Sequence, residues 1–316
     1  MKKSTVAVIV IAVIMSITGA ALFVGGMVAS GGSESAVEVL EKLEIYLNEE
    51  GLDLDISAGN HQKHDTKEMP VEKQPEETAV VSEKVQFSDM EPVTFSMEEV
   101  ESLYLEVNDA DVEFGGSTAG EIIIRTDGGY EYYVKNKVLY VKPKGIQKEH
   151  EMLIELPVLQ EAGKYLFKEA EIHAGASEIF ISEISAREFD LEIGAGRVTI
   201  NQLTAEQADF EIGAGEVIVE YGNVYDCETN VDAGNFEYTG MILKHGDVEC
   251  NLGNAEYHLE REPEDYNYEI ECGAGNVTIG KESFTGLGTE KYIDNHVQER
   301  FDIECNMGNV TIDSMN

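Results

Sequence analysis

The sequence predicts an all-β fold, a β-solenoid of glycine-turn repeats about 19–22 residues long, with an N-terminal transmembrane helix. One phrase, a strand followed by Gly-Ala-Gly and a second strand, occurs as LEIGAGRVTI at 191–200, FEIGAGEVIV at 210–219 and IECGAGNVTI at 270–279. Apolar and polar residues alternate on both sides of this turn, which indicates β-strands. A repeat period near twenty residues is typical of solenoids.

Residues 1–32 predict a short cytoplasmic tail and a transmembrane anchor. Lys2 and Lys3 precede an uncharged, mostly apolar stretch over residues 5–29, which is long enough to span a bilayer as a helix. A cleaved signal peptide is the alternative, since small residues follow at 28–30, but its apolar core usually has only about 7–15 residues. The lysines place the N-terminus in the cytoplasm. We therefore expect a single-pass protein of the cell membrane whose C-terminal domain is extracytoplasmic.

Two segments connect this anchor to the repeats. In residues 33–59, apolar residues at helical spacing predict an amphipathic juxtamembrane helix over 33–50, and LDLDISAG at 52–59 resembles a single short strand repeat. Residues 60–92 are charged, contain proline and are poor in aromatic residues, which predicts a disordered linker. The β-solenoid domain is expected to occupy residues 93–316.

Two regions at the ends of this domain depart from the regular repeat. Residues 102–114 alternate like a pair of strands and residues 131–143 are typical of a hairpin, so this region is expected to begin the solenoid or to cap it. Near the C-terminus the regular spacing breaks, and residues 280–290 are predicted to be an excursion before the last coil. An insertion of this kind can mark the binding face of a solenoid.

The four cysteines occupy inward positions of the repeats. Cys250, Cys272 and Cys305 each lie three residues before the last glycine of a turn, where other copies carry isoleucine or valine, and Cys227 lies at another apolar position. This placement favours small, buried hydrophobic side chains. Stacked coils bring such positions within disulfide range, so the sequence leaves open a bridge from Cys250 to Cys272 or from Cys272 to Cys305.

Asparagine recurs directly after the turn glycine in four copies, at Asn235, Asn254, Asn276 and Asn309. Its side chain tolerates turn geometry and forms amide ladders between stacked strands. We therefore expect these residues to stabilise the stack rather than to take part in catalysis.

The outward positions of the repeats are acidic. The chain has 62 Asp and Glu against 22 Lys and Arg, a net charge of −40, so we expect it to repel nucleic acid and anionic lipids. Positions six and four residues before each anchoring glycine form two columns that are carboxylate with a single exception. The first column is predicted to contain Glu169, Asp190, Asp209, Glu228, Asp247, Glu269 and Asp302, and the second Glu171, Glu192, Glu211, Asn230, Glu249, Glu271 and Glu304.

Two interpretations of these columns stay open. They form either a solvated surface that protects the sheet, or a binding site for Ca²⁺ or for a basic partner. The solvated surface is favoured because the turns lack the GGxGxD phrase of calcium-binding repeats, and no cofactor is expected. The candidate metal ligands are Asp190, Glu192, Asp209, Glu211, Glu269, Glu271, Asp302 and Glu304.

The turns do not predict catalysis. β-Branched residues rather than a helix follow Gly-Ala-Gly, so the turn is not a dinucleotide-binding loop, and its glycines are expected to supply positive φ at a corner. Arg197, which flanks a turn, is expected to form a salt bridge with Asp190 or Glu192. Polysaccharide-cleaving β-helices combine carboxylates with a basic residue in a groove, so a carbohydrate-active enzyme is a further alternative. It is the least favoured of the functions considered.

The repeats resemble the bacterial putative adhesins described as domain of unknown function 4097. The phrases that carry the resemblance are EIGAG at 192–196 and 211–215, CGAGNVTI at 272–279 and LEVNDADVEF at 105–114, and it covers roughly residues 93–316. The resemblance implies strand, glycine turn and strand units behind an N-terminal membrane segment. It implies no catalytic residues.

The sequence therefore predicts a membrane-anchored, non-enzymatic binding or adhesin-like protein that presents an acidic, repetitive β surface outside the cell. Its membrane contact is expected through residues 5–29, and its partner is expected to be a cell-wall polymer or a cationic peptide. The alternative is an accessory component of cell-envelope stress signalling, which would contact a membrane signalling protein through residues 33–50.

Overall fold

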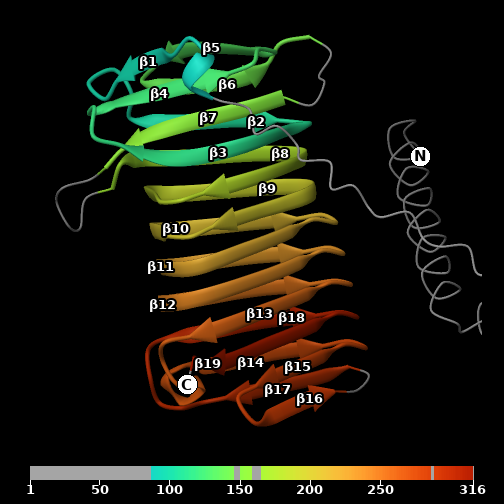
Figure 1. Cartoon of the computed structure of the whole chain (residues 1–316). Helices are drawn as coiled ribbons and strands as arrows, with labels where there is room; N and C mark the ends of the chain where they lie inside the picture. The colour runs from blue at the N-terminus through green and yellow to red at the C-terminus, as the bar shows by residue number, and fades with distance from the viewer. Residues whose placement is uncertain (1–86, 146–149, 159–164, 286–287, 316) are drawn as a thin grey trace, which may run out of the picture. The chain divides into compact units, whose positions relative to one another are not determined.

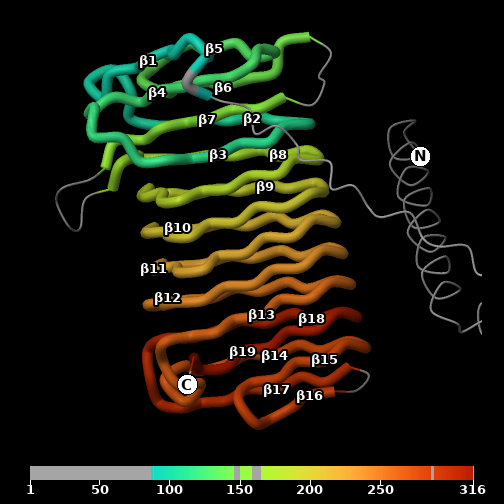
Figure 2. The backbone as a smooth tube through the Cα atoms, viewed as in Figure 1, coloured from blue at the N-terminus to red at the C-terminus, as the bar shows by residue number. Residues whose placement is uncertain are grey.

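The described chain forms a stack of β coils (Figures 1 and 2), and its buried side chains form one hydrophobic core cluster. The computed structural model describes residues 87–145, 150–158, 165–285 and 288–315. Across these residues the all-β, solenoid-like prediction is confirmed. The predicted anchor, juxtamembrane helix and most of the linker lie outside these ranges. Within them, no helix has the length and apolar character needed to cross a membrane.

Parallel strands in a regular register form the centre of the stack. Most residues of one coil lie opposite the residue nineteen positions later in the next, as Ile193 lies opposite Ile212, and the register of β11 with β12 shifts by one residue from Gly222 to Val224. This register confirms the period that the repeats predict. The central strands are β8 (Phe167–Ile181), β9 (Ile184–Ile200), β10 (Leu203–Ile212), β11 (Glu216–Val231), β12 (Asn235–Cys250) and β13 (Asn254–Leu259).

Antiparallel strands close the N-terminal end of the stack. This end contains β1 (Val93–Ser96), β2 (Ser102–Val107), β3 (Ala110–Ser117), β4 (Glu121–Thr126), β5 (Tyr130–Lys135), β6 (Val138–Pro143) and β7 (His150–Pro157), after a 3-10 turn, η1 (Phe87–Asp89). β2 and β3 stack in parallel on β8, and β6 and β7 stack in parallel on β2 and β3. β5 then pairs antiparallel with β6, and β4 with β7 and β1. The predicted strand pair and hairpin are confirmed, and the hairpin caps the stack.

The C-terminal end departs from the order of the sequence. It contains a 3-10 turn, η2 (Pro263–Asp265), and then β14 (Asn267–Cys272), β15 (Asn276–Ile279), β16 (Glu282–Thr285), β17 (Thr289–Ile293), β18 (Arg300–Cys305) and β19 (Asn309–Ser314). β18 lies between β12 and β14, and β19 lies between β13 and β15. The last coil of the sequence is therefore inserted between two earlier ones (Figure 1). The predicted excursion at 280–290 instead contributes to a cap, in which β16 pairs antiparallel with β15 and β17 with β14.

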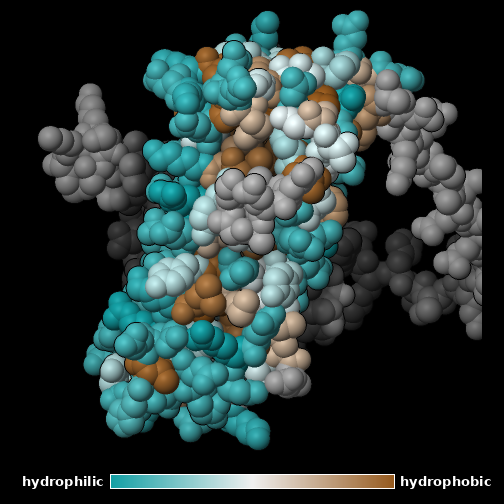
Figure 3. Space-filling view, turned by 90° about the vertical axis from the view of Figure 1, so that its left-hand side faces the viewer, coloured by the Kyte–Doolittle hydropathy of each residue, from teal (hydrophilic) through white to brown (hydrophobic). Residues whose placement is uncertain are grey.

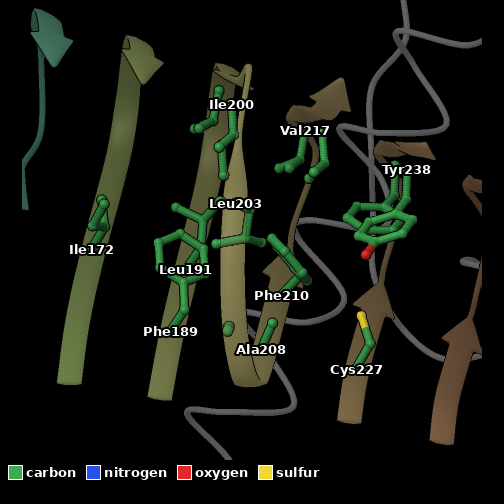
Figure 4. Close-up of a cluster of buried hydrophobic side chains, with 14 of the residues drawn as sticks. Ile172, Phe189, Leu191, Ile200, Leu203, Ala208, Phe210, Val217, Cys227 and Tyr238 are labelled. Atoms are coloured by element: carbon green, nitrogen blue, oxygen red, sulfur yellow. The ribbon is translucent and has the colours of Figure 1, made fainter. Parts of the chain in front are cut away.

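Inward side chains of successive coils pack into a single apolar core. Phe210 is fully buried, and its ring lies 5.9 Å from that of Phe189 and 5.0 Å from that of Phe236. Figure 4 shows Phe189, Leu191 and Phe210 within this cluster, together with the sulfur of Cys227. All four cysteines are buried, as predicted. Because alternate side chains point into this core, the outward positions form straight columns along the stack.

Turn glycines are required mainly by close stacking rather than by positive φ. Gly196 has a φ of 91°, but Gly215, Gly234 and Gly253 are not among the positive-φ glycines. A Cβ atom on Gly234 would overlap the carbonyl oxygen of Gly215, and one on Gly253 would overlap that of Gly234. The predicted role of positive φ therefore holds for Gly196 alone of these four.

Most of the surface seen in Figure 3 is hydrophilic, and hydrophobic side chains gather in a narrow strip down this face. This pattern fits a narrow solenoid in which every coil exposes alternate residues to solvent.

Candidate functional site

One outward column of the stack consists of carboxylates in seven consecutive coils. Backbone pairing places Asp190 directly between Glu171 and Asp209, and the same register continues toward the C-terminal cap. Neighbouring strands of a sheet are about 4.8 Å apart, so these side chains are stacked at short, regular intervals. The acidic column contains, in spatial order, Glu171, Asp190, Asp209, Glu228, Asp247, Asp302 and Glu269.

The sequence-based register is wrong by two residues in β8. Anchoring this copy on Gly175 predicts Glu169 in the first column and Glu171 in the second. The structure instead pairs Glu171 with Asp190, so Glu171 belongs to the acidic column and His173 to the second column. The physical reason is that a serine takes the place of the last turn glycine in this coil.

The second column runs beside the acidic column and contains a histidine whose ring lies between two carboxylates. His173 Nε2 lies 2.5 Å from Glu171 Oε1, and its Nδ1 lies 2.7 Å from Glu192 Oε2. Burial alone would lower the pKa of His173, but these two hydrogen bonds raise it above its ordinary value. The second column contains His173, Glu192, Glu211, Asn230, Glu249, Glu304 and Glu271.

A groove of about 400 Å³ opens on this side across the middle coils. Ala208 and Cys227 contribute to it from an inward column that carries the larger Phe189 in the preceding coil. Lys244 and His245 also line it. We call this groove, together with the acidic column and the second column, the acidic face. The carboxylates that line the groove are Glu188, Asp190, Asp209, Asp226, Glu228 and Asp247.

The carboxylates of the groove disfavour one another's ionisation. Burial, followed by repulsion from Glu228 and Asp190, raises the pKa of Asp209 to about 6. Burial and neighbouring carboxylates also raise the pKa of Asp190. Two like charges about 5 Å apart repel by roughly 1 kcal/mol even in bulk water. A cation in the groove would relieve this repulsion and lower the pKa values again.

Basic side chains compensate this charge only in part. Lys244 Nζ lies 3.1 Å from Asp226 Oδ2, at one side of the groove. His245 Nε2 lies 3.1 Å and Arg300 Nη2 lies 2.9 Å from the same oxygen of Asp302. No ion pair with Lys or Arg is found for Asp190, Asp209 or Glu228 among the described residues. The centre of the acidic face therefore has an excess of negative charge.

Arg197 is not part of the acidic face. Its guanidinium lies 2.6 Å from Glu216 Oε2, the residue opposite it in the next coil. The predicted salt bridge with Asp190 or Glu192 is wrong, because Arg197 follows the turn and points outward from the other side of the coil.

The eight predicted metal ligands are brought together in two separate groups. β11 and β12 lie between the groups, so the eight side chains do not share one site. Within the residues that the structure describes, no three or more His, Cys, Asp or Glu side chains are arranged as a metal-binding group. Calcium binding stays a prediction. One group contains Asp190, Glu192, Asp209 and Glu211, and the other Asp302, Glu304, Glu269 and Glu271.

Sequence reasoning missed the groove and its third column of outward residues. That column includes Glu188 and Asp226, two positions before the acidic column. The available signal was the loss of volume at one inward position, where Phe189 is followed in successive coils by Ala208, Cys227 and then a glycine. A run of small residues at an inward position, flanked by outward carboxylates, would have pointed to this place.

Fold and site together define a solenoid-like β protein with an acidic, grooved face. The profile of the Toastrack DUF4097 family matches residues 49–313. The chain therefore belongs to this family, and the resemblance in its repeats is confirmed. The match begins ahead of the described residues and includes the predicted single repeat at 52–59.

Several solved structures are similar at low identity. A putative adhesin from Bacteroides fragilis NCTC 9343 is 10% identical, with a TM-score of 0.39 over 71% of this chain and 96% of its own. A putative lipid binding protein from Parabacteroides distasonis ATCC 8503 is 12% identical, with a TM-score of 0.39 over 70% of this chain and 96% of its own. A putative cell adhesion protein from Clostridium sporogenes ATCC 15579 is 12% identical, with a TM-score of 0.23 over 71% and 98%. No curated protein matches the chain.

Proposed function

We propose that this chain is a non-enzymatic, adhesin-like binding protein that holds a cationic partner on its acidic face. The observation that carries the proposal is the groove, in which six carboxylates face one lysine and one histidine. Such a surface attracts positive charge and repels nucleic acid and anionic lipid.

The geometry favours an extended, polybasic partner. The carboxylates repeat along the stack at the spacing of neighbouring strands, about 4.8 Å. A lysine-rich peptide or a wall polymer with amino groups along its length could contact several of them at once, and multiple contacts of this kind add up in affinity. The raised pKa values of Asp190 and Asp209 support this, because a bound cation offsets the repulsion that raises them.

The cellular setting of the proposal rests on the N-terminal sequence. The apolar stretch at 5–29 after two lysines supports a single-pass anchor with the β domain outside the cytoplasm. In that setting the acidic face would meet wall polymers and extracellular cationic peptides.

A direct test measures binding of an oligo-lysine peptide to the full-length protein in detergent by calorimetry. Asp209→Asn combined with Glu228→Gln removes two adjacent charges from the groove. We expect the affinity to fall about five- to thirty-fold, since each exposed charge contact contributes roughly 0.5–1 kcal/mol. The matched control is Glu237→Gln combined with Glu256→Gln, an adjacent pair on the other side of the coil. An equal loss in both double variants would show that net charge alone attracts the peptide.

The second candidate function is an accessory role in envelope-stress signalling. The observation that favours it is the helical spacing of apolar residues at 33–50, next to the predicted anchor. Deleting residues 33–50 should abolish a signalling response if the helix contacts a membrane partner, and it should leave oligo-lysine binding intact. Signalling that survives the deletion would count against this second function.

A further inference from the structure

Three cysteines form a column inside the C-terminal end of the stack. Cys250 lies directly opposite Cys305, and Cys305 lies directly opposite Cys272. All three are at most 2% exposed. The coils that precede them carry Val231 and Ile212 at the same position. In this inward column, cysteine is therefore confined to the three coils in which the order of the stack departs from the order of the sequence.

The inserted coil determines which of these cysteines are neighbours. Directly opposed residues on neighbouring strands lie about 4.8 Å apart, within the range of 4.4–6.8 Å that a disulfide requires between Cα atoms. Cys305 satisfies this condition toward both Cys250 and Cys272. Cys250 and Cys272 are two coils apart, roughly 10 Å, which is beyond that range. A stack in the order of the sequence would instead make Cys272 the shared neighbour.

Side-chain directions support these two pairs. A Cβ atom on Gly308 would lie 2.5 Å from Cys250 Sγ, and one on Gly275 would lie 2.6 Å from Cys305 Sγ. Each sulfur therefore leans toward the next coil of the stack, Cys250 toward the coil of Cys305 and Cys305 toward the coil of Cys272. The absence of a side chain at these glycines leaves room for the sulfur atoms.

Hydrogen bonding distinguishes the two ends of the column. The Cys305 thiol donates to the carbonyl oxygen of Gly308 and the Cys250 thiol to that of Gly253, both at 3.2 Å. Interaction between the two sulfur groups lowers the pKa of Cys250, and the same interaction together with burial raises the pKa of Cys305. Burial raises the pKa of Cys272. A lowered pKa favours the thiolate form of Cys250, the form that attacks a disulfide.

We propose that Cys305 is a disulfide-forming residue with two alternative partners, Cys250 and Cys272, and that either bridge fixes the inserted C-terminal coil in the stack. The inference is independent of the acidic face. Of the two bridges that the sequence leaves open, it keeps the pair of Cys272 with Cys305 and excludes the pair of Cys250 with Cys272, and it adds the pair of Cys250 with Cys305.

The oxidation requires an external disulfide, such as oxidised glutathione. A thiolate at Cys250 attacks one sulfur of oxidised glutathione, which forms a mixed disulfide and releases one glutathione thiolate. The Cys305 thiolate then attacks the Cys250 sulfur and releases the second glutathione. The two protein thiols lose two protons and two electrons, and oxidised glutathione becomes two molecules of reduced glutathione. Because the thiols are buried, we expect the exchange during folding or partial opening of the last coil.

The test is a peptide map of the full-length protein refolded with oxidised glutathione, alkylated and digested under non-reducing conditions. We expect cross-linked peptides that join Cys305 to Cys250 or to Cys272, and none that join Cys250 to Cys272. Cys227 is an internal control, because it lies in a different inward column and should be fully alkylated. A bridge between Cys250 and Cys272, or the absence of any bridge, would overturn the proposal.

Valine variants sharpen the test, since an earlier coil carries valine at this position. Cys250→Val and Cys272→Val should each keep one bridge to Cys305, whereas Cys305→Val should lose both. Oxidation should raise the Tm of the wild-type protein by roughly 5–15 °C and leave that of Cys305→Val unchanged. Equal Tm values of the two proteins under reducing conditions show that the variant folds. A bridge that survives in Cys305→Val but is lost in Cys272→Val would contradict the inserted order of the last coil.

Discussion

The two outward sides of the coils differ in whether stacked side chains satisfy one another. On the side after the turn, Asn254 donates to Asn235 and Asn309 donates to Asn254, both at 2.8 Å. On the side before the turn, Asp209 and Glu228 stack in the same register but are acceptors only when ionised. An amide column supplies its own donors, whereas a carboxylate column depends on donors or cations from outside. This difference supports our proposal that the acidic face is the side that binds a partner.

A second amide ladder follows the same rule at the turn. Asn306 donates to Asn251 at 2.8 Å, and Asn251 donates to Asp232 at 3.2 Å. The amide ladder expected from the sequence is thus present at Asn235, Asn254 and Asn309, although Asn276 bonds instead to Thr278 on its own strand, at 3.2 Å. The ladder at Asn251 and Asn306 was not predicted.

The largest effect on stability is expected for a core residue that lies beneath both outward sides of the coil. Phe210 lies beneath the acidic column and packs on Phe236, which is next to Asn235. We expect Phe210→Ala to lower the free energy of unfolding by about 3–5 kcal/mol, measured by urea denaturation of the full-length protein. Phe180→Ala is the control, because Phe180 is 40% exposed and should change stability by less than about 0.5 kcal/mol. Similar losses in both variants would contradict a common core under the two columns.

Replacing an amide of the ladder by a carboxylate should lower the stability of the protein moderately. Asn254→Asp removes the donor to Asn235 and adds a negative charge beside its oxygen. We expect a loss of about 1–2 kcal/mol in the free energy of unfolding at pH 7. Asn201→Asp makes the same chemical change at an exposed corner and should be nearly neutral. Equal stability of the two variants would show that the hydrogen bonds of the ladder do not contribute to the free energy of unfolding.

Replacing a carboxylate of the acidic column by an amide should stabilise the protein. Asp209→Asn removes a charge whose neighbours repel it, so we expect the free energy of unfolding at pH 7 to rise by about 0.5–1 kcal/mol.

The stability of the wild-type protein should depend on pH for the same reason. The folded pKa of Asp209 is about 6 against an ordinary value of 3.8, so the folded state binds more protons between these values. Stability should therefore increase as the pH falls through this window.

Urea denaturation between pH 4 and pH 7, which are about two units below and about one unit above the pKa of Asp209, measures this contribution. Asp209→Asn should lose part of the increase, by about 1 kcal/mol for a partly exposed group. Glu237→Gln, which removes a charge on the other side of the coil, should keep it. An increase of the same size in all three proteins would assign the pH dependence to other groups.

The smallest effect is expected for calcium. The two groups of predicted ligands do not converge on one site, so Glu192→Gln combined with Glu211→Gln should leave calcium affinity unchanged within about twofold. Calcium titration of the full-length protein by calorimetry measures this. A saturable calcium signal that disappears in the double variant would instead favour a metal site in the second column.

Local patterns were sufficient to predict the strands and the core. Phe189, Leu191 and Ile193 alternate with polar residues, and this alternation alone determines that they point inward. The acidic column was predictable for the same reason, because outward residues of equal copies must line up once coils stack. Only in β8, where the turn lacks its last glycine, did counting from the glycine place Glu171 in the wrong column.

The order of the coils at the C-terminal end was not predictable from such patterns. NYEIEC at 267–272 and RFDIEC at 300–305 have the same inward residue types, so either could stack on β12. Connections and caps decide between them, and these depend on distant segments. The groove was missed for a related reason, since it results from small residues in three different coils, among them Ala208 and Cys227.

The most direct test of the acidic face is site-specific photo-crosslinking in cells. A photoreactive phenylalanine analogue would replace Gln207, an exposed residue that lines the groove, or Glu237, an exposed residue on the other side of the coil. We expect capture from position 207 of a lysine- or arginine-rich peptide, or of a wall polymer with amino groups, and competition by oligo-lysine. Position 237 should capture little. Equal capture from both positions, or a captured partner without positive charge, would contradict the assignment of the acidic face as the binding site.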